Sequence, residues 1–111
     1  MASQYKRILD PRVLTADMTQ PATDIWDAGA YRTLEVQARV VKAGTAGYLK
    51  IQHAAVNEED AFRDLTGGNV GLSAVDNIYF SATGFLRYVR WVTDGAVTGS
   101  PVALVDVIAK E

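Results

Sequence analysis

The sequence predicts an all-β protein, an antiparallel β-sandwich or barrel of roughly seven or eight short strands. Apolar and polar residues alternate with a period of two in several segments, which is typical of half-buried strands. Turn-forming residues separate these segments at intervals of about 8 to 12 residues. Only residues 57–65 leave room for even a short helix. An α/β fold needs helices of about ten or more residues between its strands, so we exclude it.

Residues 1–24 are expected to form an extended N-terminal arm ahead of a β-sandwich domain that spans residues 25–111. The arm is polar, contains Pro11 and Pro21, and carries the apolar pair Val13 and Leu14. Proline cannot donate a backbone hydrogen bond, which restricts such a segment to the edge of a sheet. We therefore expect one edge strand in the arm and little contribution to the core of a single chain.

The first clear strand signal of the sandwich covers residues 34–40, in which apolar and polar residues alternate. The second covers residues 48–55, with Leu49 and Ile51 on one face. A glycine-bearing connection of hairpin length, residues 42–47, lies between them. The two strands are therefore expected to pair as a hairpin.

The middle of the chain predicts shorter elements. Residues 57–60 indicate an acidic loop or one helical turn, and a short segment, 62–65, follows. Gly67-Gly68-Asn69 is a breaker signal, after which strands are predicted at 70–74 and 78–82.

Residues 85–93 are rich in aromatic and β-branched side chains and predict a further strand. Alternation places Val89 and Trp91 on one face and Tyr88 and Arg90 on the other. We place Val89 and Trp91 inward.

The last predicted strand covers residues 102–109. Its even-numbered Asp106 points outward, opposite to a wholly apolar face. That face consists of Ala103, Val105, Val107 and Ala109.

Length and charge limit the function classes. A chain of 111 residues and 12.0 kDa matches a single domain. Its net charge of -2 is too balanced to drive binding to a phosphate backbone, so nucleic acid is not an expected partner. The chain lacks cysteine. Neither a signal peptide nor a membrane span is apparent, so we expect a soluble protein made in the cytoplasm.

The sequence offers no catalytic or metal-binding set. His53 is the sole histidine, and a strand-end histidine hydrogen-bonded within the sheet is the expectation for it. Residues 57–60 lack the ligand spacing of a calcium loop and are expected to be solvated. Residues 67–71 are glycine-rich but open no helix and carry no lysine, unlike a phosphate-binding loop. No catalytic residue, metal or cofactor is therefore expected.

The aromatic residues leave two alternatives open. Side by side on one open face, they would form a sugar-binding platform; packed between sheets, they are core. Arg87 and Arg90 are either exposed sheet residues or reach carboxylates across a subunit interface, where arginine is enriched. The aromatic candidates are Trp26, Tyr31, Tyr48, Tyr79, Tyr88 and Trp91.

Three stretches, residues 26–34, 49–54 and 87–91, carry a resemblance to a known group of proteins. Together they resemble small jelly-roll-like β-sandwich modules of tailed-phage and prophage virion proteins, such as head-decoration or head-fibre proteins. The likeness spans residues 25–110. A turn common in that family is replaced here by residues 56–60, which puts any role of that turn in doubt.

The resemblance implies a non-enzymatic structural virion protein that decorates or stabilises a phage-like capsid through protein contacts. Self-association as a homo-oligomer is expected from the modest core of a 12.0 kDa chain without disulfides and from the long polar arm. The expected contact residues are Val13 and Leu14 in the arm and Tyr88 and Arg90 on the exposed sheet face. The alternative is a carbohydrate-binding module or an adhesin module associated with a phage tail or fibre. Two aromatic rings side by side on an open face would favour the carbohydrate alternative.

Overall fold

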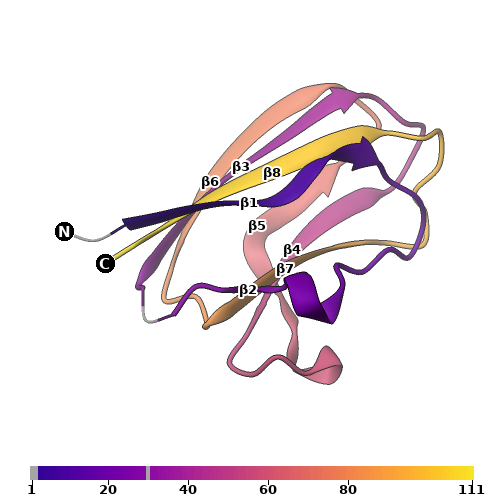
Figure 1. Cartoon of the computed structure of the whole chain (residues 1–111). Coiled ribbons are helices and arrows are strands. Elements are labelled where there is room, and N and C mark those ends of the chain that lie inside the picture. The colour runs from indigo at the N-terminus through magenta and orange to yellow at the C-terminus, as the bar shows by residue number, and fades with distance from the viewer. Residues whose placement is uncertain (1–2, 30) are drawn as a thin grey trace.

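Eight strands form two four-stranded antiparallel sheets in the computed structural model, which describes residues 3–29 and 31–111 (Figure 1). Two single-turn 3-10 helices lie in loops. Residues 1–2 of the predicted arm and Ala30 of the 26–34 stretch lie outside the described residues. In spatial order, the first sheet contains β1 (Ser3–Val13), β8 (Val102–Lys110), β3 (Thr33–Lys42) and β6 (Asp76–Thr83). The second contains β2 (Trp26–Asp27), β7 (Tyr88–Thr93), β4 (Tyr48–Ala54) and β5 (Arg63–Gly71), and the helical turns are η1 (Ala22–Asp24) and η2 (Glu59–Ala61).

The chain changes sheet at every connection except the one between β4 and β5. Two four-stranded sheets interleaved in this way make a jelly roll, an architecture in which only the outer edges of the outermost strands lack a neighbouring strand. The predicted fold class, an antiparallel all-β sandwich of jelly-roll type, is confirmed. In the described part of the chain, no helix has the length and apolar character required to cross a membrane.

The predicted hairpin between residues 34–40 and 48–55 is wrong. β3 pairs with β6 and β8, whereas β4 pairs with β5 and β7 in the other sheet. Gly47 has a φ of +101°, and a Cβ at this position would lie 2.5 Å from the Cα of Val97. The amide of Thr45 donates to the carbonyl of Thr98 at 2.9 Å. Contacts with the loop before β8 therefore lead the chain from β3 across to the second sheet.

The breaker predicted at residues 67–69 does not end a strand. Residues 63–71 form one strand, β5, which contains a bulge opposite Ile51. Lys50 pairs with Asn69, whereas Gln52 pairs with Asp64. Gly67 adopts a φ of +86°, which glycine reaches without the steric cost that other residues bear.

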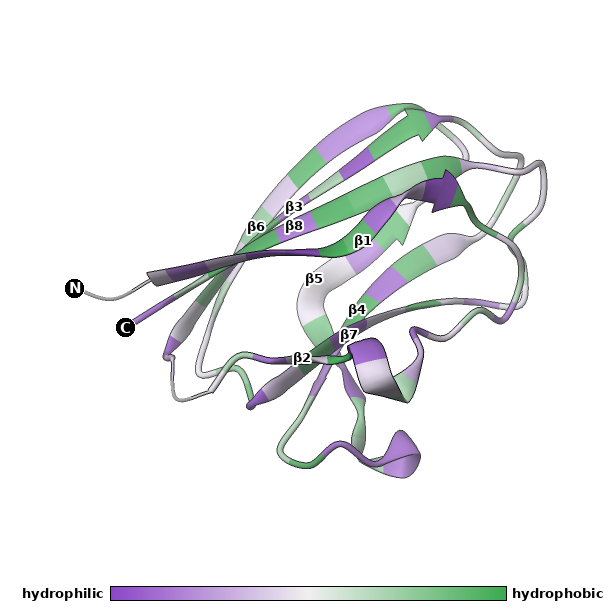
Figure 2. Ribbon diagram, in the orientation of Figure 1, coloured by the Kyte–Doolittle hydropathy of each residue, from purple (hydrophilic) through white to green (hydrophobic). Residues whose placement is uncertain are grey.

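The core lies between the sheets and contains the faces that alternation predicts. Figure 2 shows hydrophobic and hydrophilic residues alternating along β3. Val89 and Trp91 are both buried, as predicted. The apolar face of β8 is completely buried, and it consists of Ala103, Val105, Val107 and Ala109.

The N-terminal segment contributes more to the core than predicted. The expected edge strand is present: β1 pairs with β8 from Ser3, opposite Lys110, onward, so the two ends of the described chain lie side by side (Figure 1). Ile8, Leu9 and Leu14 are 6%, 2% and 1% exposed and belong to the core cluster. The expectation that this segment adds little to a single-chain core is therefore wrong, because these three side chains fill the space beneath it.

Candidate functional site

The four predicted contact residues have different surroundings. Val13 is exposed at the end of β1, and Tyr88 is half-buried at the start of β7. Leu14 is buried, and its amide donates to the carbonyl of Pro101 at 2.8 Å. Arg90 is also buried. Val13 and Tyr88 are accessible to another subunit and Leu14 and Arg90 are not, while contact with a partner at any of them stays a prediction.

Arg90 is held by groups of its own chain. Its Nε donates to Oε1 of Gln52 at 2.9 Å, and its Nη1 donates to Oε2 of Glu59 at 2.7 Å. Its Cζ lies 4.0 Å from the ring centroid of Phe62, which is a cation–π contact. The Arg90 guanidinium lowers the pKa of the Glu59 carboxyl below its ordinary value. The loop around η2 therefore covers Arg90, and the carboxylate that Arg90 meets is intramolecular.

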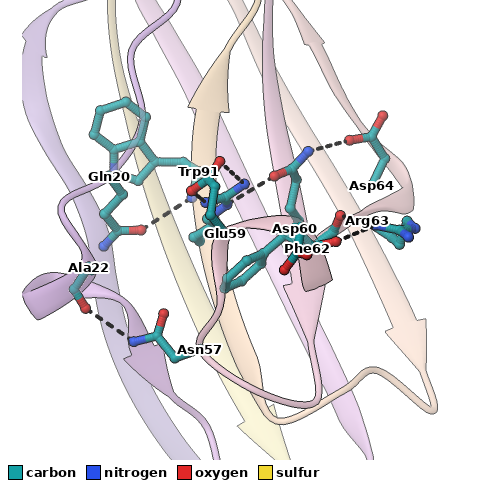
Figure 3. Close-up of polar contacts among 11 residues, drawn as sticks. Gln20, Ala22, Asn57, Glu59, Asp60, Phe62, Arg63, Asp64 and Trp91 are labelled. Carbon is teal, nitrogen blue, oxygen red and sulfur yellow. Dashed lines mark hydrogen bonds and ion pairs between the residues drawn. The ribbon is translucent and has the colours of Figure 1, made fainter.

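The side-chain amides of Gln20 and Asn57 form hydrogen bonds that connect the neighbouring loops. Gln20 accepts a hydrogen bond from the amide of Trp91 at 3.2 Å and donates to the carbonyl of Asp24 at 2.8 Å. Asn57 donates to the carbonyl of Ala22 at 3.2 Å, which ties the loop before η2 to η1 (Figure 3). Because these polar groups are used between loops, they serve the fold and do not form a ligand site.

Arg87 also has an intramolecular partner. It forms a two-pronged ion pair with Asp27, at 2.8 Å and 2.7 Å, and lowers the pKa of the Asp27 carboxyl. Both side chains are well exposed, so this pair contributes little to the stability of the fold. It fixes β2 to the loop that precedes β7.

His53 lies near the end of β4 and is hydrogen-bonded to a loop, whereas the sequence predicts a hydrogen bond within the sheet. Its Nδ1 accepts a hydrogen bond from the amide of Leu86 at 3.0 Å, and burial lowers the pKa of the imidazole. A hollow of about 320 Å³ beside it is also lined by Asp64 and Ser81. Across residues 3–29 and 31–111, no three histidine or acidic side chains are grouped so that they could hold a metal ion.

The outer face of the first sheet carries two exposed tyrosines from opposite edge strands. Tyr5 of β1 is 59% exposed and Tyr79 of β6 is 62% exposed. The Tyr5 hydroxyl donates to Oδ1 of Asp106 on β8 at 2.6 Å, and the Tyr79 hydroxyl donates to Oε1 of Glu35 on β3 at 2.9 Å. Each edge tyrosine thus reaches toward the middle of the sheet.

Between the two tyrosines lies a groove of about 210 Å³. Ile108, which pairs with both Tyr5 and Glu35 across the strands, adds an exposed apolar side chain to it. We call this surface the tyrosine face. It consists of Tyr5, Glu35, Gln37, Tyr79, Asp106 and Ile108.

The carboxylates of the tyrosine face are already occupied. Asp106 accepts from Tyr5, from Nε and Nη2 of Arg7 at 2.7 Å and 3.2 Å, and from Nη2 of Arg39 at 3.3 Å. These bonds, the strongest being that of Arg7, lower the pKa of the Asp106 carboxyl. Glu35 is paired in the same way with Lys110 at 2.6 Å, and its pKa is lowered as well. Both carboxylates of the face are therefore paired with cationic side chains.

Sequence reasoning did not find this face. Tyr5 and Tyr79 are far apart in the sequence, and only the pairing of β1 with β8 and of β6 with β3 brings them to one surface. A signal was present in part, because Tyr79 alternates with the apolar Ile78 and Phe80. That alternation marks Tyr79 as an outward residue.

A larger open groove of about 730 Å³ runs between β1 and the segment that carries η1 and β2. Trp91 lies at its base, and the guanidinium carbon of Arg12 is 6.0 Å from the Trp91 ring centroid. Its rim includes both Lys6 and Asp10, so no single charge dominates. This mixture fits neither a phosphate cradle nor a metal site.

Comparison with solved structures shows what this chain resembles in three dimensions. It is similar to the crystal structure of SPBc2 prophage-derived protein YomS, with 16% sequence identity and a TM-score of 0.58. The match covers 98% of this chain and 94% of that chain. No protein-family model matches the sequence, and no curated protein does. The two proteins therefore share one fold over nearly their whole lengths.

Proposed function

We propose that the chain is a non-enzymatic structural protein of a phage-type particle, where it binds other protein subunits, such as those of a capsid surface. The tyrosine face carries this proposal. It combines two exposed tyrosines with an exposed isoleucine, and aromatic residues of this kind anchor protein interfaces.

The charge arrangement of this face favours a protein partner. Asp106 already accepts four hydrogen bonds, which uses the acceptor sites of a carboxylate. Glu35 accepts from Tyr79 and pairs with Lys110. A partner that covers this surface therefore meets charges that are already neutralised, which lowers the cost of removing water from them.

The fold supports the particle role. The similar solved structure is titled a prophage-derived protein, and the likeness leaves almost nothing of either chain outside the shared sandwich. The sandwich offers its surfaces and edges for contact with other subunits. We accordingly propose that the protein is located in the virion after synthesis in the host cytoplasm.

A carbohydrate ligand is the second candidate, because two exposed tyrosines flank a groove on an open sheet face. Sugar binding uses aromatic rings for stacking and free polar groups for hydrogen bonds. The tyrosine face supplies the rings, but its carboxylates and both hydroxyls are engaged with each other. This observation ranks the carbohydrate candidate below the protein partner.

Fractionation of phage-type particles tests the proposal. Particles from cells that produce them together with this chain are purified on a density gradient and probed with an antibody against the chain. We expect the chain to co-sediment with the particles, and Tyr5→Ala to reduce its occupancy. Tyr48→Ala is the matched control, because Tyr48 is 50% exposed on β4 of the other sheet.

A chain that stays in the soluble fraction at every particle concentration would contradict the particle role. Binding of the purified protein to a glycan array, lost in Tyr5→Ala and kept in Tyr48→Ala, would instead support the carbohydrate candidate.

A further inference from the structure

Three of the four edge strands in the described chain have features that hinder the addition of another strand. β1 contains Pro11 and two register shifts, and the carbonyl of Ile8 is capped by the side-chain amide of Gln20. β2 has only two residues, and β5 is bulged. Short, bulged or proline-containing edges are the devices by which sheets avoid pairing with other chains.

The fourth edge strand, β6, is neither short nor bulged and is not interrupted by proline. Its one capped backbone group is the amide of Asn77, which donates to Asp76 at the start of the strand. Its eight residues pair with β3 in unbroken register, from Asp76 opposite Val40 to Thr83 opposite Thr33. It contains no proline, lysine or arginine, and Asp76 is its only charged residue. A regular edge of this length, with its one charge at the first residue, is a template for strand pairing.

The hydrogen bonds to β3 identify the backbone groups of β6 that remain free. The amide of Gly84 donates to the carbonyl of Arg32 at 2.8 Å, just beyond the ladder. In an antiparallel ladder, successive residues turn their N–H and C=O groups alternately toward and away from the neighbour. The even-numbered residues of β6 therefore bond to β3, and Asn77, Tyr79 and Ser81 turn their backbone groups to the open edge. Of these groups, the amide of Asn77 donates to Oδ1 of Asp76 at 2.7 Å.

The inner side chains of β6 are incompletely covered. Ile78, Phe80 and Ala82 pack against the core, yet each is only partly buried. They lie at the margin of the sandwich, where no further strand of the first sheet covers them. A strand added at this edge would bury the remaining apolar surface and satisfy the free backbone groups.

We infer that β6 pairs antiparallel with β6 of a second copy of this chain, around a two-fold axis at Tyr79. In this register Tyr79 faces Tyr79 of the second copy, Ile78 faces Phe80, and Asn77 faces Ser81. Each of these pairs lies on one face of the sheet. The edge-facing backbone groups of Tyr79 and Ser81 meet those of the second copy, and the Asn77 amide joins them when it exchanges Asp76 for the carbonyl of Ser81.

Charge and shape are compatible with a self-pair. Asp76, the only charged residue of the strand, falls opposite Ala82, so like charges do not face each other. Aromatic and β-branched pairs such as Ile78 with Phe80 stabilise neighbouring strands. The two copies contribute identical surfaces, as a two-fold dimer requires, and their first sheets join into one continuous sheet. This dimer forms in the purified protein, independently of the particle role proposed above.

Multi-angle light scattering of the purified chain at about 100 µM, near the range where weak dimers assemble, tests the inference. We expect a mass of twice 12.0 kDa. Tyr79→Lys brings two like charges together at the axis and should raise the dimer dissociation constant by more than about tenfold. Tyr5→Lys is the matched control, because Tyr5 is equally exposed on the same face and also bonds a carboxylate, but lies on the other edge strand.

A charge exchange makes the test specific to the axis. Tyr79→Lys and Tyr79→Glu should each be monomeric, whereas an equimolar mixture should form the heterodimer, because opposite charges then face each other. Circular dichroism confirms that each variant is folded. If Tyr79→Lys is unfolded, hydrogen exchange of the unaltered chain replaces this variant as the test. The amides of Tyr79 and Ser81 should then become more protected as the protein concentration rises. A monomeric unaltered chain, or a dimer that Tyr79→Lys leaves intact, would overturn the inference.

Discussion

The guanidinium of Arg90 stacks on the ring of Phe62, with its Cζ 4.0 Å from the ring centroid. Arg90 is only 4% exposed although it lies on the outer face of the second sheet, opposite to the inward-facing Val89 and Trp91. Phe62 is itself buried, at 6% exposure. The sheet therefore has a small second layer outside the main core, formed by the loop around η2.

Replacement of Arg90 should show how much this second layer contributes to the free energy of unfolding. Arg90→Ala is expected to lower the free energy of unfolding by about 2 to 3 kcal/mol, because it removes a cation–π contact and hydrogen bonds from a buried position. Glu59→Gln should cost less than about 1 kcal/mol, because Glu59 is 76% exposed and its ion pair is screened by water. Urea unfolding of both variants measures the difference. Equal losses would show that the ion pair, and not the stacking on Phe62, holds the loop.

Asp106 should make the fold sensitive to acid. Its pKa is lowered below 3.8 in the folded chain, chiefly by Arg7, so the unfolded chain binds a proton first as the pH falls. The stabilisation is complete well above pH 3.8 and is lost as the pH drops through the lowered pKa. Asp106→Asn should therefore destabilise the protein by about 2 kcal/mol near pH 7 and by much less near pH 2.

Urea midpoints of the unaltered chain and Asp106→Asn, measured over this pH range, check the expectation. Asp64→Asn is a suitable control, because its carboxylate is more exposed and, among residues 3–29 and 31–111, meets only Gln52 and Lys50. A constant difference between the unaltered chain and Asp106→Asn at every pH would show that the Asp106 charge is not the source of its contribution.

Gly47 should tolerate substitution least among the glycines of the connection between β3 and β4. Its φ of +101° is unfavourable for other residues, and an added Cβ would lie 2.5 Å from the Val97 backbone. Gly47→Ala is expected to cost about 2 kcal/mol or more. Gly71→Ala should be nearly neutral, because the nearest atom to its added Cβ, in Tyr48, lies 3.9 Å away. Thermal unfolding of the two variants compares them, and similar melting temperatures would contradict the close approach at Gly47.

The sequence predicts which face of a strand is buried better than it predicts which strands pair with each other. The burial of Val89 and Trp91 follows from alternation, which is a local property of a strand. The partner of β3 depends on how the chain crosses between sheets near Gly47 and Val97, which are distant in the sequence. The hairpin prediction failed because loop length alone carries no information on that contact.

The same distinction explains what was missed at the surfaces. Tyr79 can be assigned outward from its neighbours, but its position across a groove from Tyr5 depends on four strands in the correct order. Arg90 is also outward by alternation, yet it is buried because the loop around η2 folds over it. Local periodicity cannot predict that a different segment of the chain will bury an outward-facing side chain.

The final prediction concerns β1, which the sequence separates from the sandwich and the structure includes in it. Ile8 and Leu9 form an apolar pair in the middle of the segment, and Leu9 is 2% exposed. Leu9→Ala should therefore lower the free energy of unfolding by about 2 to 5 kcal/mol, the cost of a cavity in a packed core. Val13→Ala should change it by less than about 0.5 kcal/mol, because Val13 is 48% exposed. Deletion of residues 2–20, which removes Leu9, Leu14 and the buried Gln20, should abolish the cooperative unfolding transition seen by circular dichroism. If the truncated chain instead unfolds at the same temperature as the full chain, β1 is a dispensable arm, and the pairing with β8 contributes nothing to folding.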